Sequence, residues 1–306
     1  MNSELEFALP SNAPIRSVRD ISGFFKALEG DTTYWDCQQD NWVYRGQSKI
    51  RDIWPLQPKA ARFFEPALKN QQGWKDAHKK TTTSNGVIEE DIPKFFPPRD
   101  IQVFNEWCER AVAYTDKLPK NEWERLALAQ HYGLATRLLD WSSNPLVALF
   151  FAVSEENGEH GTVYIYLPHE TSIDPIKHCL SEFQGTFERS SGFVYRPRPI
   201  DQRMVQQSAI FTYHPEPLTA LIPIQEQADR QRTNTSLRRY GTDLMTIVIE
   251  SSLKDTFRKQ LARLGVTREK LFPDLDGLSA ELNHTNCCGI KTIHSKGIPM
   301  EWLPPG

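Results

Sequence analysis

The sequence predicts an α+β protein, a single domain in which helices flank a mixed sheet core. Three observations lead to this fold class. Segments with helical spacing and strand-like segments follow one another irregularly, without the repeated βαβ order of a parallel α/β fold. The 306 residues are 39% hydrophobic and 25% charged, as in an ordinary globular chain. No internal repeat or low-complexity tract divides the chain.

The first hundred residues contain a predicted helix, a predicted strand and a polar segment. Residues 17–30, SVRDISGFFKALEG, begin at a capping serine and carry apolar residues at helical spacing, which predicts an amphipathic helix. The apolar run NWVYRG at 41–46 predicts a strand. Residues 66–100 are polar and lack periodicity, so we expect an excursion or insertion outside the core. Helical spacing returns at 101–114.

The segment 119–167 has the clearest signals for helices and strands. Asn121 is a helix cap for EWERLALAQHYG, and Gly133 ends this helix. LATRLLDW is strand-like, and SSNP then places Pro145 at the first position of a new helix. LVALFFAV is apolar on nearly every side, which predicts a buried helix. GTVYIYL at 161–167 predicts a strand.

The later part of the chain mixes loops with regular elements. Residues 184–202 are rich in aromatic, arginine and proline residues, which predicts an irregular loop, and 203–214 is the next strand candidate. A polar, basic loop is expected at 225–241. A strand at 243–250 and a helix at 252–265 follow it.

Composition excludes several classes of protein. The net charge of −3 provides no global field toward nucleic acid or a membrane, although a local basic patch stays open. The longest apolar run, at 145–153, is about half the length that a bilayer span needs. The N-terminus lacks the basic start and apolar core of a signal peptide. Five cysteines without metal-ligand spacing indicate a reducing cytoplasm, no disulfides and no metal site.

Four blocks of the sequence resemble the signature blocks of the FRG domain family, a bacterial family named for an aromatic–Arg–Gly motif. The blocks are WVYRGQ, LALAQHYGLATRLLDWSSNPLVALFFAV, RMVQQSAIF and LFPDLDGL, and the motif is Tyr44-Arg45-Gly46. They follow the family's order. The resemblance implies a single FRG domain over 1–306, with a core at about 18–282 and a C-terminal tail at 283–306. The chain departs from the pattern at Ala209, where the family usually has glycine.

DWSSNPLVALFFA also resembles the strand, loop and buried helix of mono-ADP-ribosyltransferases. That resemblance implies an ADP-ribosyltransferase-like core with Arg45 on an early strand and Ser142 and Ser143 at a helix start. Residues 184–202 would be the substrate-reading loop, and Gln207 would lie on a late strand. The chain departs here as well, because RMVQQSAIF lacks the catalytic glutamate of those enzymes.

The implied ligand is NAD, as a substrate. A guanidinium binds phosphate oxygens through paired hydrogen bonds, which would match Arg45 with the pyrophosphate. The helix start at Pro145 and the hydroxyls of Ser142 and Ser143 would add donors. Gln207 can hold ribose hydroxyls, but it supplies no negative charge for the cationic ribose that forms during bond cleavage. Asp140 is the nearest carboxylate in the motif.

These arguments yield three sets of candidate residues. The catalytic candidates are Arg45, Ser142, Gln207, His131 and Asp140. The candidates for nucleotide binding are Arg45, Gly46, Tyr132, Arg137, Ser142 and Ser143. The substrate-loop candidates are Phe193, Tyr195 and Arg196.

A structural role competes with each of these assignments. Arg45 could pair with Asp140 or another acid, and Ser142 and Ser143 could act only as helix-start residues. His131 could form hydrogen bonds at a helix C-terminus, and Arg137 could be an ion-pair partner.

Three functions stay open at this point. The first is a nucleotide-binding site that acts on NAD, as an ADP-ribosyltransferase or NAD glycohydrolase with a protein or nucleic-acid target. The family resemblance suggests a toxic effector in phage defence for such a protein. The second is a nucleic-acid-binding or nuclease-like module that uses the arginine loops at 189–198 and 225–241. The third is a non-enzymatic interaction domain. No membrane partner is expected.

Overall fold

The structure, a computed structural model, describes most of the predicted core. The described residues are 15–29, 42–49, 56–63, 81–82, 88–89, 99–156, 158–168, 172–183, 193–215, 217 and 244–283. The predictions for the loops at 184–192 and 225–241 and for the tail beyond 283 fall outside them. Of the polar excursion at 66–100, the structure describes an antiparallel pair, β3 (Thr81–Thr82) and β4 (Ile88–Glu89), and the first residues of a helix.

A seven-stranded mixed sheet forms the centre of the described fold. Its spatial order is β1-β9-β6-β2-β5-β8-β7. Only β1 and β9 pair in parallel among its strands, and the other pairs are antiparallel. The mixed sheet with flanking helices agrees with the predicted fold class. The strands are β1 (Ile15–Val18), β2 (Val43–Gln47), β5 (Leu138–Ser142), β6 (Gly161–Tyr166), β7 (Phe193–Tyr195), β8 (Ala209–Tyr213) and β9 (Leu244–Ile249).

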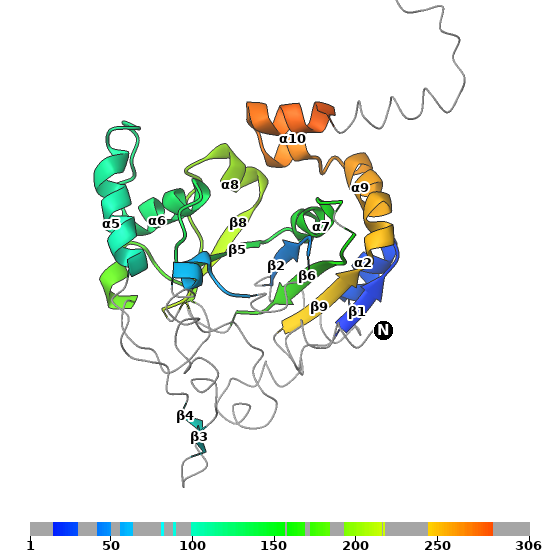
Figure 1. The fold of residues 1–306 in the computed structure, drawn as a ribbon, viewed down its shortest axis with the longest axis horizontal. Coiled ribbons are helices and arrows are strands. Elements are labelled where there is room, and N and C mark those ends of the chain that lie inside the picture. Colours follow the sequence, from blue (N-terminus) through cyan, green and yellow to red (C-terminus); the bar gives the residue numbers. More distant parts are fainter. Residues whose placement is uncertain are drawn as a thin grey trace, which may run out of the picture.

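Three helices pack together in the largest apolar cluster, which takes side chains from one face of the sheet. They are α2 (Ile21–Glu29), α7 (Pro145–Val153) and α9 (Lys254–Arg263). Figure 1 shows α7 beside β2 and β6, with α2 and α9 near β1 and β9. Leu149, Ala152 and Val153 of α7 are fully buried, as the apolar run predicted. Asn144 caps α7 and Pro145 starts it, also as predicted.

Two glycines allow α7 to lie directly on the sheet. A Cβ added to Gly46 of β2 would lie 1.8 Å from the carbonyl oxygen of Ala148. At Gly161 of β6 the corresponding distance to the carbonyl oxygen of Ala152 is 2.2 Å. Real side chains do not approach a backbone this closely. Packing of α7 therefore explains why the aromatic–Arg–Gly motif ends in a residue without a side chain.

A second cluster, rich in aromatic residues, joins the other edge of the sheet to α5 (Arg99–Ala111) and α6 (Glu122–His131). Asn121 caps α6 as predicted, since its side chain accepts hydrogen bonds from the amides of Trp123 and Glu124. The buried Trp123 ring lies 5.1 to 5.6 Å from three other rings, which belong to Phe183, Tyr195 and Tyr213. Phe183 ends the short helix η2 (Leu180–Phe183).

Two predictions for the later part of the chain are wrong. Residues 193–195 form the strand β7 and not a loop, because Val194 and Tyr195 bury their side chains. The strand predicted at 203–214 begins only at Ala209, and α8 (Gln202–Gln206) precedes it. Asp201 starts this helix by accepting a hydrogen bond from the amide of Arg203. The aspartate was a local signal for the helix.

The described C-terminal part is helical. The helix predicted at 252–265 appears as η4 (Ser251–Leu253) and α9. After it come α10 (Arg268–Leu271) and a helix at 275–283, which lie close to α8 and α9 in Figure 1. Lys59 begins η1 (Lys59–Phe63), a short helix between β2 and α5 in sequence. Over the described ranges, no helix has the length and apolar character needed to cross a bilayer.

Candidate functional site

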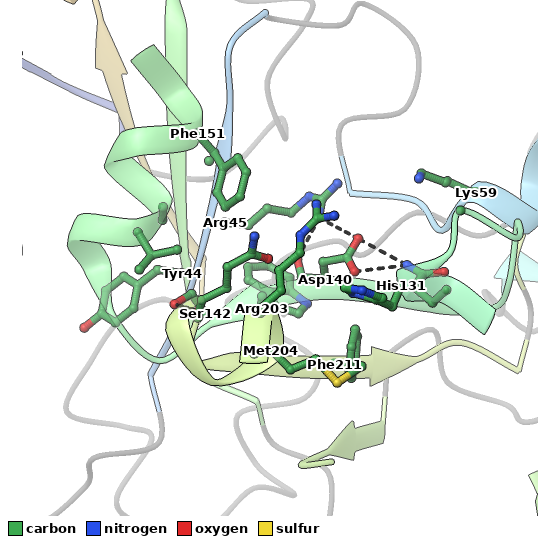
Figure 2. Close-up of a pocket in the computed structure, with 18 residues that line it drawn as sticks. Tyr44, Arg45, Lys59, His131, Asp140, Ser142, Phe151, Arg203, Met204 and Phe211 are labelled. Atoms are coloured by element: carbon green, nitrogen blue, oxygen red, sulfur yellow. Dashed lines mark hydrogen bonds and ion pairs between the residues drawn. The ribbon is translucent and has the colours of Figure 1, made fainter. Parts of the chain in front are cut away.

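A cavity of about 440 Å³ opens among the central strands and the helices beside them. Its walls come from β2, α6, β5, α7, α8, β8 and η1 (Figure 2). The lining residues are Tyr44, Arg45, Gly46, Lys59, Gln130, His131, Gly133, Asp140, Trp141, Ser142, Val147, Ala148, Phe151, Arg203, Met204, Gln207, Ala209 and Phe211.

The cavity brings together all the residues that the sequence marked as catalytic candidates. Those residues are Arg45, His131, Asp140, Ser142 and Gln207, and the nucleotide-binding candidate Gly46 also lines the cavity. The other candidates do not line it. These are Tyr132, Arg137, Ser143, Phe193, Tyr195 and Arg196. The roles assigned to both groups stay predictions, and the contacts below show what each side chain does in the fold.

The Arg45 side chain reaches from β2 to Asp140 on the neighbouring strand β5. Its Nη1 donates to the backbone oxygen of Asp140 at 2.7 Å and lies 3.7 Å from the carboxylate Oδ2. The arginine side chain keeps 21% of its surface exposed and the aspartate side chain 52%. The ion pair considered as an alternative is therefore present, and it is open to solvent rather than sealed in the core.

A buried glutamine orients the Asp140 carboxylate. The Nε2 of Gln130 donates to both carboxylate oxygens at 3.1 Å, and it also reaches the backbone oxygen of Leu138. Thr136 donates from Oγ1 to the Oε1 of Gln130 at 2.6 Å, which sets the orientation of the amide. Figure 2 shows the carboxylate near the side chains of Arg45, Arg203 and His131. A partly exposed negative charge is thus held in a defined position in the cavity.

Ser142 takes part in the turn that leads into α7. Its Oγ donates to the backbone oxygen of Gln207 at 2.7 Å and accepts from the amide of Asn144 at 3.0 Å. The first donors of α7 are also used, because Asn144 accepts a hydrogen bond from the amide of Leu146. Ser143 is exposed, and its amide donates to the backbone oxygen of Ser208. These contacts place both serines in the turn before α7, whose cap is Asn144, and their roles toward a ligand stay predictions.

Gln207 lines the cavity from a position other than the predicted strand. It is the C-cap of α8, and its Nε2 donates to the backbone oxygen of Leu271 at 3.0 Å. The strand prediction failed because the Asp201 cap makes the preceding residues helical. The chain then turns through Ser208, whose φ of 48° is left-handed.

His131 is a largely buried base at the end of α6. Its side chain is 14% exposed, and its Nε2 lies 3.6 Å from the Oδ1 of Asp201. Burial lowers the pKa of His131, while the Asp201 charge opposes that effect. A lowered pKa favours the neutral ring, which is the form that can accept a proton.

Three of the predicted binding and substrate-loop residues, Arg137, Phe193 and Tyr195, pack within the fold. Arg137 is buried against Asp100, with Nε to Oδ2 at 2.5 Å and Nη2 to Oδ1 at 3.1 Å. The ion-pair role considered for it is the one observed. Tyr195 is fully buried, and the Phe193 ring lies 4.9 Å from that of Phe183. Arg196, which follows β7, is exposed.

The model of the FRG domain family matches residues 40–161. This FRG match begins before β2 and ends at the first residue of β6, so it contains the aromatic–Arg–Gly motif and α7. No curated protein and no solved structure matches the chain.

The cavity extends beyond the FRG match. Arg45, His131 and Asp140 lie within the match, whereas α8 and β8 contribute from outside it. Among the described residues, no three side chains of His, Cys, Asp or Glu come together as a metal site would require.

Sequence reasoning missed one charged residue of the cavity in particular. Arg203 of α8 lines the cavity, and its guanidinium carbon lies 4.3 Å from the ring centroid of Phe272. Arg203 opens the block RMVQQSAIF, but the strand predicted there gave it no place in a site. Asp201, the cap of α8, was the local signal that could have shown that a helix begins here. Lys59 and Gln130 are further lining residues that were missed.

We expect His214 to make the protein acid-sensitive. His214 is buried beside the site, and its Nε2 lies 2.9 Å from Thr212 Oγ1. Burial, and secondly the charge of Arg45, lower its pKa from 6.5 to about 4. As the pH falls through 6.5, His214 binds a proton in the unfolded chain but stays unprotonated in the folded chain. Stability that is present above pH 6.5 is therefore lost between pH 6.5 and 4, by about 3 kcal/mol.

Urea denaturation at several pH values measures this loss. A His214→Gln variant, which keeps a polar group but does not titrate, should lose less stability over the same range than the wild type. Carboxylates add an acid slope to both proteins, so the difference between the two slopes isolates the histidine. Parallel slopes would show that His214 is not protonated differently in the two states.

Proposed function

We propose that the cavity binds a nucleotide with a diphosphate and that NAD is its substrate, cleaved by an NAD glycohydrolase or ADP-ribosyltransferase activity. The observation that carries this proposal is the convergence of one oriented carboxylate with an excess of cations in one cavity. Arg45, Lys59 and Arg203 line it together with Asp140, the only acidic residue among the lining residues. Such a set attracts an anionic ligand and keeps a negative charge for the reacting centre.

The reaction would break the bond between the ribose C1′ and the nicotinamide nitrogen. The electron pair of that bond leaves with nicotinamide, which becomes neutral, and positive charge develops on the ribose. Asp140 would stabilise that charge, which Gln207 cannot do. Water, or a nucleophile of a target, then adds to C1′, and neutral His131 would accept its proton.

The apolar walls of the cavity suit flat rings. Phe151, whose side chain is only partly buried, lines it together with the buried residues Phe211, Trp141 and Tyr44. Ligand sites commonly combine such walls with a few placed polar groups in cavities of about 300–1,000 Å³. A nucleoside ring against these walls would leave its phosphates toward the arginines.

The biological role follows from the FRG resemblance and the proposed activity. A protein that consumes NAD would be a toxic effector, and phage defence is the setting that the family suggests. Expression of the wild type in a bacterial host should then arrest growth with a fall in cellular NAD. Normal growth with unchanged NAD would contradict the toxic role. The enzymatic proposal would then be decided by the nicotinamide-release assay.

Nicotinamide release from NAD tests the activity. Arg45→Ala should lower the rate by about 10- to 100-fold, because a charge-assisted hydrogen bond to phosphate is lost. Arg110→Ala is the matched control, since Arg110 is an exposed residue of α5 that pairs with Glu106. If the wild type shows neither hydrolysis, transfer nor NAD binding, the proposal is wrong.

One observation favours a non-enzymatic interaction domain as a second candidate. Ser142 and Gln207 form hydrogen bonds within the fold, and so does Arg45. In that case the signature residues hold the structure, and Arg45→Ala should lower the melting temperature. An unchanged melting temperature would contradict this candidate. The nucleic-acid alternative has weaker support, because Phe193 and Tyr195 pack in the core and are not free to stack on bases.

A further inference from the structure

We infer that Arg203 is the second diphosphate-binding residue of the site and that Phe272 positions it. This inference rests on the proposed nucleotide site and names the residues that complete it. Both lie beyond the FRG match. The C-terminal part of the chain would therefore supply one of the two arginines that bind the diphosphate.

Arg203 differs from Arg45 in having an uncommitted guanidinium. Within the described part of the chain, no hydrogen bond or ion pair involves that group, and its contact is the stacking on Phe272. Arg45 donates to Asp140, whose charge also acts on Arg203. Of the three acids whose charges act on Arg203, only Asp140 lines the cavity. A ligand with two phosphate groups would supply hydrogen-bond acceptors for both arginines.

Asp201 and Asp274 act on Arg203 by charge, but their hydrogen bonds go to backbone amides. Burial lowers the pKa of Arg203, and the carboxylates of Asp274, Asp140 and Asp201 oppose that effect. Asp201 accepts a hydrogen bond from the amide of Arg203 at 2.7 Å, and Asp274 accepts one from the amide of Gly277 at 2.7 Å. These two carboxylates accept hydrogen bonds at helix starts. Among the residues that the structure describes, none accepts a hydrogen bond from the Arg203 guanidinium, so a ligand could use its N–H donors.

Phe272 is a positioning residue, because its ring touches arginines and does not line the cavity. Arg203 lies 4.3 Å and Arg268 5.1 Å from the ring centroid. The Phe151 ring, which lines the cavity, meets the Phe272 ring edge to face at 6.0 Å. Next to Phe272, Leu271 accepts the hydrogen bond of Gln207, which ties the segment to α8. Stacking of this kind holds a guanidinium in one plane and leaves its edges for phosphate oxygens.

Calorimetric titration of the full chain with inorganic pyrophosphate and with ADP-ribose at low salt tests the inference. Arg203→Gln should weaken binding of both probes by about 10- to 100-fold. Phe272→Leu, which keeps an apolar residue without a π face, should weaken both by about 3- to 10-fold. Phe272→Tyr should restore binding to within about twofold of wild type, which a merely structural role would not require. Arg110→Gln is the control.

Each outcome decides a different part. If the wild type does not bind pyrophosphate, or if Arg203→Gln binds both probes as the wild type does, the inference is overturned. A normal Phe272→Leu variant beside a weak Arg203→Gln variant overturns only the role of Phe272. If Phe272→Leu does not fold, Arg203→Lys takes its place, because lysine keeps the charge without the planar stacking and should also weaken binding. Pyrophosphate binding without NAD cleavage would overturn the proposed activity and leave this inference standing.

Discussion

A Gly46→Ala variant should lose at least about 3 kcal/mol of unfolding free energy. The methyl group would lie 1.8 Å from the carbonyl oxygen of Ala148, and the amide nitrogen of Ala152 is 2.8 Å away. Both atoms belong to the backbone of α7, so no side-chain rotation relieves the overlap. The helix must move off β2, which opens the main apolar cluster. Chemical denaturation followed by circular dichroism measures the loss.

Gly23→Ala is the matched control for that experiment. Gly23 lies within α2, and an added Cβ would meet its nearest neighbour, Asp20 Oδ1, at 3.4 Å. Alanine is also the better helix former by about 1 kcal/mol, so this variant should be as stable as the wild type or slightly more stable. If Gly46→Ala unfolds within about 1 kcal/mol of the wild type, α7 does not pack on β2 as described.

Asp140→Asn should reduce nicotinamide release from NAD by about 100- to 1,000-fold. The substitution keeps the size and shape of the side chain and removes its negative charge. An asparagine oxygen can still accept from Gln130, so we expect the fold to persist. Only the stabilisation of the cationic ribose is lost, and the effect should therefore be on kcat. Steady-state kinetics with NAD, together with the melting temperature, measures both consequences.

Asp116→Asn is the control for the charge change, since Asp116 is an exposed residue between α5 and α6. Affinity for ADP-ribose should fall much less than turnover in Asp140→Asn, because ADP-ribose lacks the cationic centre. Wild-type turnover in this variant would mean that the carboxylate of Asp140 does not stabilise the transition state. The proposed mechanism would then need its negative charge from another residue.

Arg45 and Gly46 are adjacent in the motif, but they have different roles in the fold. Gly46 lets α7 approach β2, and the Arg45 guanidinium donates to the backbone oxygen of Asp140 on β5. The sequence marks Gly46 as a candidate for nucleotide binding, and a missing side chain lets either a ligand or a helix come close. Only the position of Ala148 distinguishes the two.

Local sequence was sufficient for most helices and central strands. Asn121 and the Asn144-Pro145 pair start their helices through hydrogen bonds to residues two or three positions away. The apolar surface of α7 follows in the same way from its own nine residues. Such signals depend on neighbours in the chain, so they can be read before any tertiary contact is known.

The site itself depended on contacts between distant residues. Arg45 and Asp140 are 95 positions apart, and they meet because β2 lies between β6 and β5 in the sheet. Arg203 and Phe272 meet because α8 and α10 pack together, and no local pattern marks that contact. The burial of Tyr195 and Arg137 likewise follows from which elements cover them. Caps and periodicity arise from short-range geometry, whereas the cavity arises from the order in which strands pair, and many orders are compatible with the same local pattern.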